Sequence, residues 1–257
     1  MIRTLLLACT FLVIHPAANM AHAQEQTKPV SLTIAAAADL SSALREIAQD
    51  YKHQAGVDLK LSFGASGMLT QEIQNGAPFD VFLSADMDYP RQLIAAGAAE
   101  ASSLVQYARG KLVLWVPADS QLDLHQELKV LLDPAVKKIA IANPQHAPYG
   151  RAAMAALKHS DLYERTRDRL VTAENVAQAA QFVESGNAQA GFVALAHAVA
   201  PGMREKGRYW EIPAEDYPPL LQGAVVLARS QQKKEAGKFV EYLKSEQGSA
   251  VLRRYGF

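Results

Sequence analysis

Ser66 stands at the junction between two expected elements and is the residue most able to do chemistry. The segment 63–68, FGASGM, follows an expected strand at 57–62 and leads into an expected helix at 68–75. The first N–H groups of a helix have no partner inside it and lie at the positive end of its dipole, so an anion can bind there. Ser and Gly also begin helices for capping alone. The junction alone predicts either an anion site or a simple cap.

The chain lacks the short motifs of several enzyme classes. No G-x-S-x-G elbow, P-loop, H-E-x-x-H pair or G-x-G-x-x-G fingerprint occurs in it. No histidine spacing is typical of a local metal pair. We expect the histidines beyond the first 23 residues at the surface or at helix ends, with His146 as the one that a ligand could reach. They are His53, His125, His146, His159 and His197.

The first 23 residues have the pattern of a secretory signal peptide. Arg3 precedes an apolar run at 5–14, and the small-residue motif Ala21-His22-Ala23 follows. About ten apolar residues are too few to span a bilayer. We expect cleavage after about Ala23 and a soluble periplasmic product without cysteine, because the only cysteine is Cys9.

Composition argues against several classes of partner. The chain has 26 Lys and Arg against 26 Asp and Glu, and loss of Arg3 leaves a net charge of about −1. Nothing in this balance predicts binding to nucleic acid or to a strongly charged membrane. With no cysteine for a disulfide or a metal, stability must come from a packed core, which a chain of this length can form.

The elements that must position Ser66 alternate along the chain. This alternation predicts parallel sheets covered by helices, with sites at the carboxyl ends of the strands. Strands are expected at 31–38, 57–62, 79–84, 111–116, 138–142, 191–195 and 224–228, and helices at 40–55, 68–75, 89–96, 151–159, 174–184 and 233–244.

The chain is long for one sheet and fits two α/β lobes. Candidate crossings between lobes lie at 107–111 and 218–223. We expect residues 24–108 together with 222–257 to form the first lobe and residues 109–221 the second. Two crossings predict a hinged cleft.

Several loop segments match one family together. They are AAAADL at 35–40, SFGASG at 62–67, NGAPFD at 75–80, SAD at 84–86, NPQHAPYG at 143–150, ENV at 174–176 and RYGF at 254–257. In this order the chain after residue 23 resembles the periplasmic molybdate-binding proteins of ABC transporters. The resemblance implies a type II periplasmic binding protein fold, in which each lobe is a mainly parallel sheet flanked by helices and the cleft between the lobes holds a tetrahedral oxyanion.

The resemblance also implies an oxyanion site at Asp39, Ser66, Tyr149 and Val176. Ser66 would donate through its hydroxyl and its N–H, and Tyr149 and Val176 through their backbone N–H groups. The family's first loop supplies a small hydroxyl residue or Asn, and that position falls on Asp39. Members with a tyrosine as fifth donor have it where this chain has Ala194, so that hydroxyl is missing here. No free metal cation and no cofactor are expected, because molybdenum would bind as its oxyanion.

An ionised carboxylate at Asp39 conflicts with a bound dianion. At about 4 Å it would cost on the order of 4 kcal/mol per unit of ligand charge at an effective dielectric of 20. The Asp39 carboxylate could turn away from the ligand and cap the helix near Leu40. Alternatively, Asp39 could contact the ligand, either because Asp39 is itself protonated or because it accepts a hydrogen bond from a protonated ligand. The Tyr149 side chain could pack under its loop or fill the space left at Ala194. We expect Asp86 to cap the helix that follows it, outside the site.

The resemblance implies capture without catalysis. The lobes would close around molybdate or tungstate, and the membrane permease of an ABC transporter would recognise the closed monomer. Two alternatives stay open. One is a binding protein of the same fold for a different oxyanion or for a metal chelated through Asp39. The other is an exported serine hydrolase built on Ser66, which needs a base beside the hydroxyl.

Overall fold

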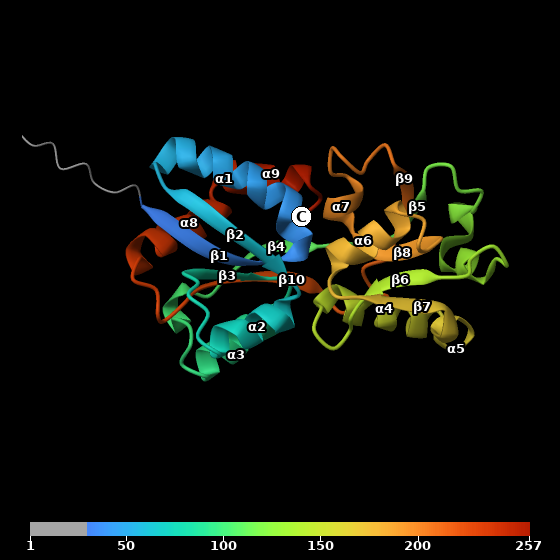
Figure 1. Cartoon of the computed structure of the whole chain (residues 1–257), viewed down its shortest axis with the longest axis horizontal. Helices are drawn as coiled ribbons and strands as arrows, with labels where there is room; N and C mark the ends of the chain where they lie inside the picture. The colour runs from blue at the N-terminus through green and yellow to red at the C-terminus, as the bar shows by residue number, and fades with distance from the viewer. Residues whose placement is uncertain (1–29) are drawn as a thin grey trace, which may run out of the picture.

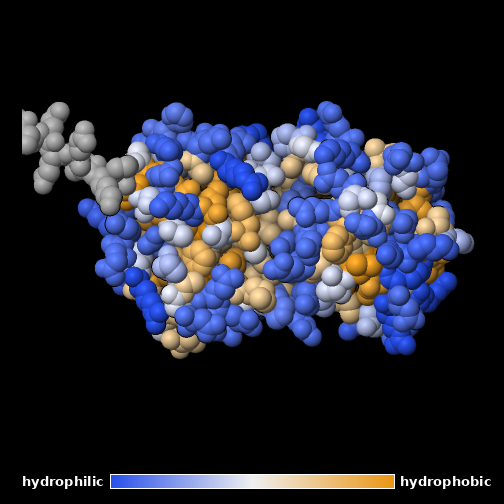
Figure 2. Space-filling view, in the orientation of Figure 1, coloured by the Kyte–Doolittle hydropathy of each residue, from blue (hydrophilic) through white to orange (hydrophobic). Residues whose placement is uncertain are grey.

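The computed structural model describes residues 30–257, so the predicted signal peptide lies outside the described residues. These residues form two α/β lobes side by side, with the first lobe on the left in Figure 1 and the second on the right. Hydrophilic side chains cover much of both lobes on the face shown in Figure 2, and an apolar area lies on the first lobe. Within residues 30–257 no helix has the length and apolar character needed to cross a membrane.

The first lobe is built on a five-stranded mixed sheet. β1 pairs in parallel with β2 and β3, and β10 runs antiparallel between β3 and β4. In spatial order the strands are β2 (Asp58–Gly64), β1 (Ser31–Ala37), β3 (Val81–Ser84), β10 (Leu220–Val226) and β4 (Val105–Gly110). The helices, which lie above and below the sheet in Figure 1, are α1 (Ser41–Ala55), α2 (Ser66–Gln74), α3 (Asp88–Ala95), α8 (Lys233–Lys244) and α9 (Glu246–Arg254), with short 3-10 turns η1 (Ala38–Leu40) and η2 (Ala101–Ser103).

The second lobe repeats this plan. β6 pairs in parallel with β7 and β8, and β5 runs antiparallel between β8 and β9. The strands in spatial order are β7 (Leu170–Ala173), β6 (Ile139–Ala142), β8 (Ala190–Ala194), β5 (Leu112–Pro117) and β9 (Gly207–Glu211). Its helices are α4 (Pro148–His159), α5 (Tyr163–Thr166), α6 (Val176–Glu184) and α7 (Leu195–Ala198), with 3-10 turns η3 (Leu124–Leu132) and η4 (Arg167–Arg169).

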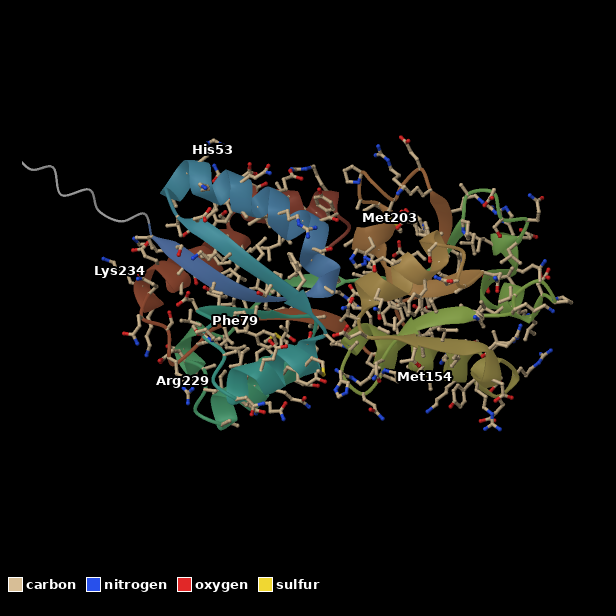
Figure 3. The ribbon with its side chains drawn as sticks, in the orientation of Figure 1. His53, Phe79, Met154, Met203, Arg229 and Lys234 are labelled. Atoms are coloured by element: carbon tan, nitrogen blue, oxygen red, sulfur yellow. The ribbon has the colours of Figure 1, made fainter. Side chains whose placement is uncertain are left out.

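Local sequence explains these elements and their ends. In α1 the buried residues Leu44, Ile47 and Tyr51 recur at helical spacing, and the helix ends at Gly56, whose φ of 67° is the left-handed conformation that glycine adopts without strain. Side chains fill the space between helices and sheets in both lobes (Figure 3). Trp115 of the second lobe is among the largest fully buried side chains, and burying one large apolar side chain contributes about 1.5–3 kcal/mol.

The structure adds elements that the pattern did not predict. β4, β7, β9 and α9 were missed, and the expected crossing at 107–111 is largely strand β4. β4 and β9 lie at sheet edges, where most of their positions are exposed or only partly covered, so they carry no continuous apolar run. The chain leaves the first sheet after Gly110 and rejoins it at Leu220. Because β10 and β5 each run against both of their neighbours, four strands of each sheet run in one direction and one strand runs against them.

Candidate functional site

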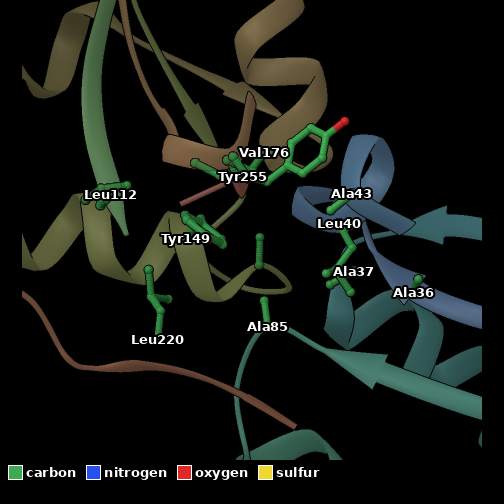
Figure 4. Close-up of a cluster of buried hydrophobic side chains, with 14 of the residues drawn as sticks. Ala36, Ala37, Leu40, Ala43, Ala85, Leu112, Tyr149, Val176, Leu220 and Tyr255 are labelled. Carbon is green, nitrogen blue, oxygen red and sulfur yellow. The ribbon is translucent and has the colours of Figure 1, made fainter. Parts of the chain in front are cut away.

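Loops from both lobes meet at one small cavity. All four residues implied by the resemblance line it, namely Asp39 and Ser66 from the first lobe and Tyr149 and Val176 from the second. Figure 4 shows Tyr149 and Val176 across from Ala37 and Ala85. The complete lining is Ala37, Ala38, Asp39, Gly64, Ala65, Ser66, Ala85, Ala147, Pro148, Tyr149, Asn175 and Val176.

Ser66 is the first residue of α2 and is buried beside the cavity. Its Oγ accepts a hydrogen bond of 3.0 Å from the N–H of Ala85. This bond uses a lone pair of the hydroxyl and leaves its hydrogen free to be donated. The backbone N–H of Ser66 is one of the unpaired donors of a helix start. Ser66 is therefore placed to donate twice to an anion.

Val176 owes its free N–H to the residue before it. Asn175 caps α6, and its side-chain oxygen accepts from the N–H groups of Ala177 and Gln178 at 3.1 Å each. The Val176 N–H is the first of the helix and has no acceptor within it. The cap both stabilises α6 and leaves this donor at the cavity.

Tyr149 occupies the first turn of α4, directly after Pro148. Its N–H is also one of the donors that a helix start leaves unpaired. The next residue, Gly150, is packed so tightly that an added Cβ would lie 2.2 Å from the carbonyl oxygen of Ala142. Only glycine lets α4 begin this close to the end of β6, which brings the Tyr149 N–H to the cavity.

The cavity is rich in donors and has no cation in its lining. The starts of α2, α4 and α6 contribute N–H groups and the positive ends of three helix dipoles. Within residues 30–257, Asp39 is the only ionisable lining residue besides Tyr149, and no Lys or Arg lines the cavity. Such a set of fixed, uncharged donors suits a small anion.

Asp39 is 1 % exposed, and its carboxylate belongs to a buried polar cluster. Its Oδ2 accepts from the side-chain amide of Gln222 at 2.8 Å, and the Gln222 Oε1 accepts from the hydroxyl of Tyr107 at 3.2 Å. Within residues 30–257 no hydrogen-bond partner reaches Asp39 Oδ1. Burial raises the pKa of Asp39 to about 6, and the hydrogen bond from Gln222 opposes this shift.

No bond from Asp39 meets the geometry of a helix cap, although the N–H groups of Asp39 and Leu40 lie near enough to its carboxyl to lower the pKa. Neither η1 nor α1 has a side-chain cap. The carboxylate instead bonds to Gln222 on β10, which lies 183 positions later in the chain. The local sequence around Leu40 could not reveal this partner, because sheet pairing brings it into place.

The Tyr149 hydroxyl lies inside the same buried cluster. It is close to Gly110 and to the amide of Gln222, since an added Cβ on Gly110 would lie 2.2 Å from the hydroxyl and 2.7 Å from the amide nitrogen. No partner within the described residues meets hydrogen-bond geometry with it, but the Asp39 carboxyl lies near enough to interact with this hydroxyl. Burial first, and then the nearby charge of Asp39, raise the pKa of Tyr149 well above 10, so it is neutral. Ala194, the position where the resemblance implied a tyrosine in some members, is fully buried at the end of β8.

Two groups of contacts join the lobes next to the cavity. On one side the N–H of Gly67 donates to the carbonyl of His146 at 2.8 Å. Nearby, Arg151 of α4 forms an ion pair of 2.5 Å with Asp86. Asp86 also accepts from the N–H groups of Asp88 and Tyr89 at the start of α3, so the expected helix cap is confirmed, while its role between the lobes was missed.

His197 supplies the second contact between the lobes. It lies in the last turn of α7, as the expected helix-end position implied, but it is buried rather than exposed at the surface. Its Nε2 is 3.1 Å from the carbonyl of Ala38 and 3.3 Å from Ser41 Oγ. Since a carbonyl only accepts, Nε2 carries the hydrogen. Burial lowers the pKa of His197 to about 4, so the ring is neutral at pH 7.

The other histidines do not approach the cavity. His53, His125 and His159 are exposed, and His146 uses its backbone rather than its ring in the contact with Gly67. In the described part of the chain no three His, Cys, Asp or Glu side chains gather where they could hold a metal ion. The Ser66 hydroxyl meets a backbone N–H rather than the base that a nucleophile needs.

Comparison with known proteins agrees with this geometry. A family model described as bacterial extracellular solute-binding protein matches residues 32–257. The chain belongs to this family. It is 39% identical to the molybdate-binding protein ModA of Azotobacter vinelandii over 87% of this chain and 88% of that one, and 34% identical to ModA of Rhodobacter capsulatus over 87% and 86%.

Solved structures show the same fold. The periplasmic molybdate-binding protein of Azotobacter vinelandii superposes with a TM-score of 0.83 at 35% identity, covering 88% of this chain and 97% of that one. The sulfate-binding protein SubI of Mycobacterium tuberculosis has a TM-score of 0.70 at 15% identity, covering 89% and 86%, which shows a shared fold alone. The predicted two-lobed periplasmic binding protein fold is confirmed.

Proposed function

We propose that this protein captures molybdate, and also tungstate, between its two lobes and delivers it to the membrane permease of an ABC transporter. The observation that carries the proposal is the meeting of three helix starts from both lobes at one cavity without a Lys or Arg in its lining. The relatives at 39% and 34% identity are molybdate-binding proteins, which supports the choice of oxyanion.

Each proposed donor has a defined role. Ser66 would donate through its hydroxyl and N–H from the first lobe, while the N–H groups of Tyr149 and Val176 would donate from the second. The ligand then favours the closed form because only that form brings both sets together. Fixed N–H donors spread the charge of a dianion over local dipoles and hold tetrahedral oxygens at set positions.

The protein would work as a periplasmic monomer without catalysis. The signal peptide predicted at residues 1–23 would direct export, and the lobes predicted at 24–108 with 222–257 and at 109–221 would move as two bodies. The hydrolase alternative gains no support from the neighbours of Ser66, and chelation of a metal through Asp39 lacks further ligands in the described structure.

A thermal-shift titration of the purified protein tests this function. Molybdate or tungstate at micromolar concentration should raise the Tm, since a ligand that binds only the folded state stabilises it by mass action. Sulfate and phosphate at the same concentrations are the matched controls, because they are tetrahedral oxyanions of different size. Indifference to both molybdate and tungstate would disprove the proposal, and a response to sulfate or phosphate alone would reassign the ligand.

A further inference from the structure

The carboxyl of Asp39 has one oxygen without a partner at the proposed ligand cavity. Asp39 is 1 % exposed and lines the cavity together with Ser66, Tyr149 and Val176. Gln222 satisfies Oδ2 at 2.8 Å, while among the described residues no donor meets hydrogen-bond geometry at Oδ1, although the Tyr149 hydroxyl and the N–H groups of Asp39 and Leu40 lie near enough to lower the pKa of the carboxyl. A buried carboxyl oxygen left unpaired costs free energy unless a ligand or a proton completes it.

No charged group beside Asp39 compensates for a negative charge on it. Tyr107 on β4 and Tyr149 on α4 face the carboxyl, and burial raises the pKa of both well above 10, so both are neutral. His197 of α7 contacts the preceding residue and is neutral at pH 7. Gln222 of β10 is uncharged, and Arg45 of α1 lies exposed over the ring of Phe63. The start of α6 adds no titratable group to the cavity.

We propose that Asp39 binds the oxyanion as a neutral carboxyl, with Oδ1–H donating to a ligand oxygen, so that capture of the dianion takes up one proton from the solvent. This inference rests on the proposed function. The step forms one O–H bond on Asp39 and one hydrogen bond to the ligand, and no other bond changes. The proton replaces the repulsion between the carboxylate and the dianion by a charge-assisted hydrogen bond. Such bonds are stronger in a site that excludes water.

The direction of the pH dependence follows from the carboxyl. Burial already raises the pKa of Asp39 to about 6, and a dianion beside it raises the pKa further. Below about pH 6 the carboxyl of Asp39 is already protonated in the free protein, so binding of the oxyanion takes up few protons. Above it the free protein must gain the proton on binding, so affinity falls as pH rises, by about tenfold per pH unit for one proton.

Isothermal titration with molybdate tests the proton uptake directly. Binding is measured at pH 6, 7 and 8 in PIPES, HEPES and Tris, whose different heats of ionisation report the number of protons taken up. We expect an uptake that approaches one at pH 8, and a Kd about tenfold weaker at pH 8 than at pH 7. This measurement of proton uptake needs only the wild-type protein, so it does not depend on whether a variant folds.

Asp39→Asn provides the second readout. The amide has the shape of the carboxyl and donates an N–H at every pH, so this variant should bind without proton uptake, with a Kd independent of pH and tighter than wild type at pH 8. Asp119→Asn in the second lobe, away from the cavity lining, removes the same charge and should leave proton uptake unchanged. A wild-type protein that binds molybdate with no proton uptake and a flat pH profile overturns the inference, whereas absence of molybdate binding at every pH overturns the proposed function as well.

Discussion

The hydroxyl of Ser66 illustrates how a single neighbour sets the direction of a donor. Because Oγ accepts the N–H of Ala85, its own hydrogen is directed elsewhere, and the buried position excludes water as an acceptor. A serine that served only as a helix cap would use its oxygen on the N–H groups of its own helix. Here the oxygen instead accepts from the N–H of Ala85, in a loop of the same lobe, and no bond of α2 uses it as a cap.

Replacing Ser66 by alanine should weaken oxyanion binding by roughly 1 to 3 kcal/mol, since one ligand oxygen loses a donor in a dry cleft. Titration calorimetry with molybdate measures this. Ser160→Ala is the matched control, because that hydroxyl bonds back to the carbonyls of Ala156 and Leu157 at the far end of α4. An affinity equal to wild type would remove Ser66 from the site.

At the residue scale, the sequence predicted which residues line the cavity better than it predicted the hydrogen-bond partners of their side chains. Asp39, Ser66, Tyr149 and Val176 were placed by motif, and all four line one cavity. The bond from Gln222 to Asp39 could not be predicted, because it joins residues 183 positions apart through the pairing of sheet strands. The burial of His197 was missed for the same reason, since its partner Ala38 comes from the other lobe.

At the scale of elements, helix starts do the positioning. α2, α4 and α6 each begin where a strand of the same lobe has just ended, so their first N–H groups come together at the carboxyl edges of the two sheets. The helix pattern predicted these elements from their apolar spacing. It placed the starts of α2 and α4 two and three residues late, because Ser66, Gly67 and Gly150 carry no apolar signal.

Asn175→Ala should lower the free energy of unfolding by about 1 kcal/mol and also weaken molybdate binding, because loss of the cap lets the Val176 turn fray. Urea unfolding and calorimetry measure the two effects. Ser245→Ala removes the cap of α9, away from the cavity lining, and should destabilise comparably while leaving affinity unchanged. Equal effects of both variants on affinity would show that α6 has no special role.

At the scale of the whole molecule, the described structure is a closed form held by contacts between the lobes. Arg151 bonds to Asp86 at 2.5 Å and to the hydroxyl of Tyr89 at 3.2 Å, so one side chain of the second lobe joins two residues of the first. The order of loops predicted two lobes and a cleft. It did not predict these joining contacts, because charged residues at loop ends have no periodic pattern.

Arg151→Gln should raise the Kd for molybdate about two- to fivefold, mainly through faster release, because the half-exposed ion pair contributes about 0.5 to 1 kcal/mol to the closed form alone. Stopped-flow release of ligand measures this. Lys206→Gln breaks the Lys206–Glu184 pair within the second lobe and should leave the release rate unchanged. Release no faster than in that control would show that the pair does not hold the cleft closed.

The contact between Gly67 and His146 acts as a mechanical stop. It joins main-chain atoms of both lobes, and an added Cβ on Gly67 would lie 2.9 Å from the His146 carbonyl oxygen, so the two surfaces already touch. A contact between main-chain atoms cannot be relieved by a change of side-chain rotamer. In the proposed binding cycle this contact would fix the width of the closed cleft, and an oxyanion too small to span that width would not draw the lobes any nearer.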